Sequence, residues 1–330
     1  MTSRFALPAA LLALLLMLAL ASLATGATGI DPETLIAALI GVDPAASIIV
    51  GELRLPRTLA ALLVGFALGL SGAALQGLTR NPLAEPGVLG VSACATLGAT
   101  LMLYFGIADS SPLGVASGAI AGAIIATAIL AAFAQRLTGV ATLVLVGVGL
   151  SSFAGALMAL LLNFAPNPFS LSDLVNWSLG SVANRSLIDL AYAFPPVMAG
   201  ALLVLGTRRA LTLLSIGDLA ASSHGLDYRN TRLMVIGGTG LAIGAAVALA
   251  GAVGFVGIIA PHLVRPWVRH DPGRTLLPAG LAGAAMLLAA DMLIRLLPTG
   301  TELRLGVVAA LAGAPLFMLI AWRRGARSHG

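Results

Sequence analysis

One serine and one histidine are the first candidates for catalytic residues in this sequence. Residues 69–72 read Gly-Leu-Ser-Gly, a pattern in which Ser71 could act as the nucleophile of an intramembrane protease, and His262 is the histidine available inside an apolar segment. Gly65 and Gly77 extend this run of small residues, which is equally typical of helices that pack closely in a membrane. A protease requires Ser71 and His262 to meet, whereas a packing face does not.

A carboxylate and a guanidinium form the second candidate. Asp291 and Arg295 lie four residues apart in an apolar segment, so a helix would place them on one face. An unpaired charge at the bilayer centre costs about 2.5–3.5 kcal/mol on insertion scales, and pairing relieves that cost. We therefore expect a structural ion pair, with a proton relay as the alternative. A relay needs further buried carboxylates, and the interiors of the other predicted membrane segments contain none.

Phosphate chemistry of the P-loop kind is excluded because the sequence contains no lysine: all 18 basic residues are arginines. If ATP drives a process here, its hydrolysis belongs to a separate subunit. Cys94 is the single cysteine, so no disulfide framework exists, and we expect it to be a small packing residue. Apart from the protease alternative, we predict no catalytic residue, and we predict no metal site and no cofactor.

Composition points to a membrane protein. Of 330 residues, 59% are hydrophobic and 9% are charged, and the mean hydropathy is +1.02. Such values lie far outside those of soluble domains, and they leave room for about ten helices of roughly 20 residues in a single transmembrane domain, residues 1–330. The first apolar run is longer than the core of an ordinary signal peptide, so we expect it to be retained. The predicted spans are 5–25, 57–78, 91–107, 113–134, 140–162, 189–207, 231–252, 256–268, 275–297 and 305–322.

The distribution of arginines predicts the orientation. With both termini in the cytoplasm, thirteen of the 18 arginines lie on the inner side and five lie on or near the outer side. The net charge of +5 therefore reflects membrane topology, and we predict no nucleic-acid partner. The outer loop, about 163–188, could hold a short interfacial helix with Trp177 at headgroup depth. The inner loop, about 208–230, reads as two short helical turns broken by Gly217 and Gly225, and its mixture of apolar and polar residues suits a soluble partner.

Several segments carry a family resemblance. Residues 54–98 open with Arg-Leu-Pro-Arg and close with the loop Arg-Asn-Pro-Leu-Ala-Glu-Pro-Gly, and residues 254–265 read Gly-Phe-Val-Gly-Ile-Ile-Ala-Pro-His-Leu-Val-Arg. With 302–306 and 313–315, these segments resemble the FecCD permease family, the membrane subunits of ATP-driven importers for iron–siderophore complexes, haem and cobalamin. Relatives usually have proline where Arg304 stands. The resemblance runs from about residue 50 to the C-terminus.

The resemblance implies an all-α, polytopic membrane protein with a cobalamin-permease-like fold, that of a type II ABC importer. It implies a permease in the bacterial inner membrane that works by alternating access as a homodimer, with two cytoplasmic ABC ATPase subunits and a periplasmic substrate-binding protein as partners. The expected cargo is a ferric siderophore, with haem or cobalamin next. A stand-alone secondary transporter is the alternative function, and an intramembrane serine protease is a more remote one.

Three groups of residues follow from this resemblance. Docking of the binding protein is assigned to Arg54, Arg57 and Arg295, although a role of Arg295 toward the partner conflicts with its pairing to Asp291. Coupling to the ATPase is assigned to Ser215, Gly217, Asp218, His224 and Gly225. The inner gate is assigned to Asn81, Leu83 and Thr142.

Overall fold

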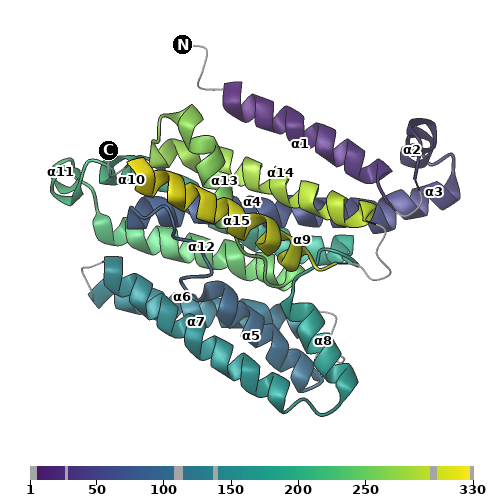
Figure 1. Ribbon diagram of the computed structural model, residues 1–330, viewed down its shortest axis with the longest axis horizontal. Coiled ribbons are helices and arrows are strands. Elements are labelled where there is room, and N and C mark those ends of the chain that lie inside the picture. Colours follow the sequence, from purple (N-terminus) through teal and green to yellow (C-terminus); the bar gives the residue numbers. More distant parts are fainter. Residues whose placement is uncertain (1–5, 27–28, 108–113, 137–139, 298–302, 328–330) are drawn as a thin grey trace.

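The computed structural model describes residues 6–26, 29–107, 114–136, 140–297 and 303–327. Within these ranges the chain is helical and contains no β-strand (Figure 1). The ten helices that correspond to the predicted spans are α1 (Ala6–Ala24), α4 (Leu55–Thr79), α5 (Val91–Tyr104), α6 (Gly114–Arg136), α7 (Val140–Asn163), α9 (Leu187–Gly206), α12 (Tyr228–Ala250), α13 (Val256–Val264), α14 (Pro272–Leu296) and α15 (Leu305–Arg327).

These helices differ in whether they are long enough to cross a bilayer. Seven of the described helical segments have the length and hydropathy of a membrane span, whereas α5 and the apolar part of α15, Leu305–Pro315, are shorter. The helix α13 has nine residues and continues into a 3₁₀ turn, η3 (Arg265–Val268). Irregular backbone on either side of so short a helix is tolerated at membrane depth because α13 packs against α4 and α14.

Close contact of α4 with α13 and α14 accounts for the glycines along α4. A Cβ atom on Gly65 would lie 2.4 Å from the carbonyl oxygen of Gly283, and one on Gly72 would lie 2.0 Å from that of Gly257 in α13. Only glycine allows the backbones to approach this closely. Ser71 between them is fully buried, and its hydroxyl has no hydrogen-bond partner among the described residues, so it is not bonded to His262. This arrangement fits a packing face and counts against a serine nucleophile.

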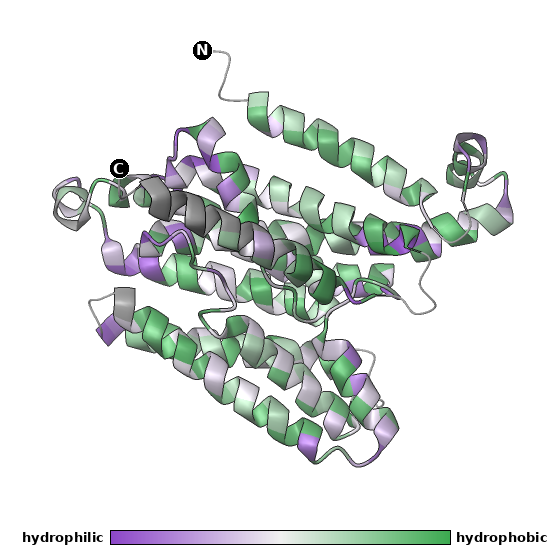
Figure 2. Ribbon diagram, viewed as in Figure 1, coloured by the Kyte–Doolittle hydropathy of each residue, from purple (hydrophilic) through white to green (hydrophobic). Residues whose placement is uncertain are grey.

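The remaining helices pack around this central contact. The helix α12 contacts α4 on one side and α6 and α9 on others, and α5 packs against α6 and α7 (Figure 1). Polar residues gather at the ends of the long helices, while their middle parts are apolar (Figure 2). At one such end α6 meets α12, where Arg229 donates to Gln135 at 2.9 Å and Arg232 donates to the carbonyl oxygen of Ala134 at 2.7 Å.

Sequence analysis did not predict the helices between the first two spans. These are α2 (Pro32–Leu39), α3 (Pro44–Ile48) and a π-helical turn, η1 (Ile49–Arg54), that leads directly into α4. Asp31 and Asp43 cap α2 and α3, each followed by proline at the first helical position. Asp-Pro pairs of this kind are a recognised start signal, so the sequence did contain the evidence. The hydrogen bond from Thr34 N–H to Asp31, 2.8 Å long, lowers the pKa of that exposed carboxyl.

The helices predicted in the two longer loops are present. The loop predicted to lie outside contains α8 (Pro168–Ser178), which includes Trp177. The loop predicted to lie inside contains α10 (Arg208–Leu214) and α11 (Asp218–Ser223), separated by Gly217 with φ of 102° and followed by Gly225 with φ of 77°. Both values lie in the left-handed region that glycine adopts without strain. In Figure 1, α11 lies at one end of the molecule and α2 and α3 lie at the other.

Candidate functional site

The three arginines predicted for docking lie together at the end of the molecule where α1 ends and α4 begins. Arg57 forms a two-pronged ion pair with Asp291 on α14, with Nη2–Oδ1 at 2.7 Å and Nε–Oδ1 at 2.9 Å. Arg295 holds the other carboxylate oxygen at 3.0 Å, which confirms the expected pair within α14. The Asp291 side chain is 1% exposed. One buried carboxylate thus joins α4 to α14, and its partner Arg57 was not predicted.

The other two arginines hold the end of α1. Arg54 donates to the carbonyl oxygens of Leu23 and Ala24, both at 2.8 Å, and Arg295 donates to those of Ser22 and Thr25, both at 2.9 Å. The last carbonyls of a helix lack partners within the helix and carry partial negative charge, so guanidinium groups stabilise them. The structure therefore gives Arg54 and Arg295 intramolecular contacts that sequence analysis did not foresee.

The three arginines differ in how far they are exposed to solvent. The Arg57 side chain is 15% exposed and the Arg295 side chain 7%, while Arg54 is 6% exposed. Arg57 and Arg295 share the carboxylate of Asp291, and Arg54 contributes a third guanidinium group at the same end of the molecule. An acidic partner approaching this end would meet Arg57 more readily than Arg54 or Arg295.

Two of the three residues predicted for the inner gate, Asn81 and Leu83, lie at the opposite end of α4. Arg80 ends α4 with φ of 51°, and the Asn81 side chain accepts the Leu83 N–H at 2.9 Å, which forms a tight turn and leaves Leu83 exposed. The following loop, residues 81–90, reaches α7, where Ser151 donates to the carbonyl oxygen of Gly87 at 2.9 Å. Thr142 is half-buried at the start of α7, more than two turns before Ser151.

The residues predicted for coupling form an exposed segment beside the N-terminal end of α14. Thr212 of α10 donates to Asp271, the N-cap of α14, at 2.7 Å, and two leucines of α10 are buried, so this helix is firmly attached. Ser215 and His224 end α10 and α11 and bond to carbonyl oxygens within the segment. Gly217 and Gly225 provide the turns, whereas the side chain of Asp218 lies outside the part that the structure describes.

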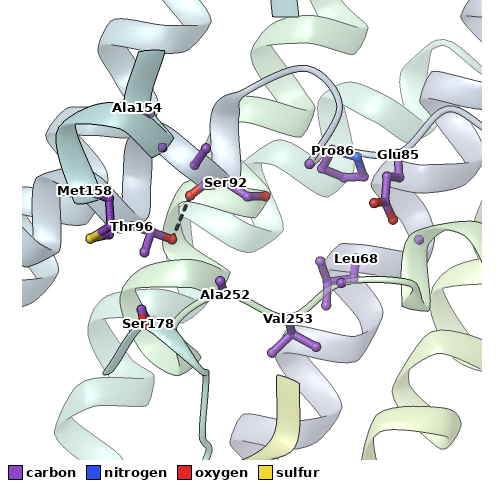
Figure 3. A pocket seen from close by; sticks show the side chains of 15 residues that line it. Leu68, Glu85, Pro86, Ser92, Thr96, Ala154, Met158, Ser178, Ala252 and Val253 are labelled. Carbon is purple, nitrogen blue, oxygen red and sulfur yellow. Dashed lines mark hydrogen bonds between the residues drawn. The ribbon is translucent and has the colours of Figure 1, made fainter. Parts of the chain in front are cut away.

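A cavity of about 340 Å³ lies between α4, the 81–90 loop, α5, α7 and the segment before α13 (Figure 3). Its wall is mostly apolar, with Leu68, Met158 and Val253 among the lining residues, and the hydroxyls of Ser92 and Thr96 add polar atoms. Glu85 also lines it. Glu85 belongs to the predicted loop, but no role was predicted for it. An acidic residue between two prolines and flanked by apolar spans was nevertheless a signal of buried charge.

Several of the described helices leave apolar faces uncovered, among them α1, α7 and α15. In α7, Leu145, Phe153 and Leu160 are each at least half exposed, and in α15 the same holds for Leu311 and Met318. A shallow groove of about 520 Å³ runs along α15 beside Leu179 and Ala252. Surfaces of this kind in a membrane protein contact either lipid or another helix.

Comparison with known proteins identifies the family. The model of the FecCD transport family matches residues 14–323. The chain is 40% identical over 287 residues to the vitamin B12 import system permease protein BtuC of Escherichia coli K12 / DH10B, covering 86% of each chain, and BtuC of Escherichia coli O1:K1 / APEC matches equally well. It is also similar to a solved structure described as an inward-facing conformation of a metal-chelate type ABC transporter, with a TM-score of 0.86, 32% identity and coverage of 95% and 98%. The chain therefore belongs to the FecCD transport family and is a multi-pass permease of an ABC importer.

Proposed function

We propose that this permease carries a metal chelate across the bacterial inner membrane, as a homodimer served by two cytoplasmic ATPase subunits and a periplasmic binding protein. The observation that carries the proposal is the two-ended arrangement of the chain. A cluster of three arginines around the buried Asp291 pair lies at one end, an exposed helical segment lies at the other, and a mostly apolar cavity lies between α4, α5 and α7. Such an arrangement suits an importer that receives cargo on one side and is driven from the other.

The second copy is proposed to contact the uncovered faces of α7 and α15. Exposed leucine, phenylalanine and methionine side chains follow both helices, and the groove along α15 is lined by small residues that allow close helix approach. The pathway would then run between the two copies, where each contributes its cavity. The exposed segment α10–α11 is proposed to receive the ATPase, and both termini are proposed to lie in the cytoplasm, in line with the distribution of arginines.

Two cargo classes are supported. Cobalamin is favoured by the vitamin B12 permeases that are 40% identical, and a ferric siderophore, the first expectation from the sequence, is supported by the likeness to a metal-chelate type transporter. The experiment is uptake into proteoliposomes that hold the complete complex with ATP inside, with radiolabelled cyanocobalamin and a ferric hydroxamate siderophore offered separately. We expect ATP-dependent accumulation of cyanocobalamin. Accumulation of the siderophore alone would reverse the order of the two cargoes, and accumulation of neither would refute the proposal.

A further inference from the structure

Glu85 gives the cavity a charge that nothing else in its wall balances. Among the described residues that line the cavity, it is the one with an ionisable side chain, and the others contribute hydroxyls, a thioether, backbone or hydrocarbon (Figure 3). The polar contact recorded for its carboxylate is with a backbone N–H, that of Phe255, at 3.3 Å. No arginine forms an ion pair with Glu85 within the described part of the chain.

One hydrogen bond holds the Glu85 carboxylate, and another holds the loop that carries it. Phe255 is the N-cap of α13 and adopts the left-handed conformation, with φ of 66°, so its N–H points at Glu85. On the other side of the loop, Ser151 of α7 binds the carbonyl oxygen of Gly87 at 2.9 Å. The pKa of the Glu85 carboxyl is raised above its ordinary value, because the effect of burial is larger than the opposing effect of the Phe255 hydrogen bond. The positive end of the α13 dipole likewise favours the ionised form.

We propose that Glu85 determines which cargo charge the cavity accepts, so that neutral or cationic chelates enter and anionic ones are disfavoured. This inference rests on the proposed function and adds a specificity residue to it. Two like charges within about 8 Å, at the effective dielectric constant of about 20 found near protein surfaces, interact strongly enough to change an equilibrium or a rate by about ten- to a hundredfold. No cation in the described wall offsets this effect.

The electrostatic potential in the cavity can be measured without knowing which cargo is carried. In a Cys94→Ala background, Ser92→Cys places a thiol in the wall, and Ser178→Cys places a second one elsewhere in it. Each is reacted at pH 8, above the ordinary pKa of a carboxyl group, with the cationic trimethylammonium-ethyl and the anionic sulfonato-ethyl methanethiosulfonate, in the reconstituted complex. The exposed Ser172→Cys, outside the cavity, supplies the reference ratio of the two rates. We expect the cation to be favoured at least tenfold more at the cavity thiols than at position 172.

Glu85→Gln is the decisive change because it removes the charge and keeps an oxygen for Phe255 N–H. It should bring the rate ratio at the cavity thiols to that of the reference. A ratio that Glu85→Gln leaves unchanged would overturn the inference, and so would cavity thiols that react with neither reagent, since the cavity would then admit no solute. Glu85→Ala also removes the hydrogen-bond acceptor for Phe255 N–H. A difference between its rate ratio and that of Glu85→Gln therefore measures the structural contribution of this hydrogen bond.

Transport supplies the second readout. Wild-type and Glu85→Gln complexes are compared for uptake of cyanocobalamin and of its monocarboxylic acid, which has nearly the same size and one negative charge. The binding protein is identical in both complexes, so its own preference cancels in the comparison. We expect Glu85→Gln to raise uptake of the acid relative to cyanocobalamin about tenfold or more. An unchanged ratio overturns the role of Glu85 alone, whereas a wild type that carries no corrinoid overturns the cobalamin cargo and leaves the thiol measurement to decide on Glu85.

Discussion

Asp291 is the residue whose loss should most disturb the end of the molecule where α1 ends and α4 begins. Its side chain is 1% exposed, and it accepts charged hydrogen bonds from Arg57 on α4 and from Arg295 one turn further along α14. Asp291→Asn keeps the shape and removes the charge, which leaves Arg57 and Arg295 buried beside a neutral amide, with Arg54 nearby. Removing one partner of a buried ion pair costs about 3–5 kcal/mol, because the charge that remains is uncompensated.

We therefore expect Asp291→Asn to lower the free energy of unfolding by about 3–5 kcal/mol. The assay is denaturant-induced unfolding of the purified protein in detergent micelles, followed by tryptophan fluorescence. Asp173→Asn makes the same chemical change on the exposed face of α8 and serves as the matched control, with an expected effect within about 0.5 kcal/mol.

A double variant distinguishes the effect of the lost charge on stability from the effect of altered packing. Asp291→Asn combined with Arg57→Gln also removes one of the two cations that this carboxylate pairs with, so it should be more stable than Asp291→Asn alone, and the double-mutant cycle should show a coupling of more than about 1 kcal/mol. Wild-type stability for Asp291→Asn, or a double variant less stable than the single one, would refute the claim that this carboxylate holds α4 and α14 together through its charge.

Three further predictions concern the two ends and the packing face. Arg57→Gln should weaken binding of the periplasmic protein to the reconstituted complex at low ionic strength and matter less at high salt, and equal affinity at low salt would exclude Arg57 from docking. Replacing Gly217 and Asp218 together should lower substrate-stimulated ATP hydrolysis without preventing membrane insertion, and normal stimulation would refute the coupling assignment. Ser71→Ala should leave uptake nearly unchanged, whereas loss of a measured peptidase activity in this variant would revive the protease.

The long helices could be predicted because their evidence is local. An apolar run of about 20 residues bounded by arginines predicts a span without knowledge of its neighbours, and glycine at 217 and 225 predicts a break in the same way. The helices α2 and α3 were missed, although Asp31 and Asp43 precede prolines, because they are too short to be detected by hydropathy. Their start signals lie in capping residues rather than in apolar character.

Contacts between distant segments could not be predicted. The pairing of Arg295 with Asp291 is visible as an i, i+4 spacing, but Arg57 lies 234 residues from Asp291, and no spacing rule relates them. The carbonyl groups that Arg54 and Arg295 bind belong to the backbone of α1, and every residue has a carbonyl, so the sequence contains no mark of these acceptors. Glu85 was overlooked for a related reason, since its burial depends on where the 81–90 loop folds.

The same contacts determine how the docking arginines can be tested. A glutamate at position 57 would repel an acidic partner, but it would also face Asp291 at the distance now occupied by an ion pair, so Arg57→Glu would destabilise the contact between α4 and α14 as well as weaken docking. Glutamine at 57 avoids the second carboxylate and leaves Asp291 paired with Arg295. Because screening by salt acts on exposed charges far more than on a buried pair, a loss of affinity that shrinks as ionic strength rises belongs to docking. A loss that does not change with salt belongs to the packing of α1, α4 and α14.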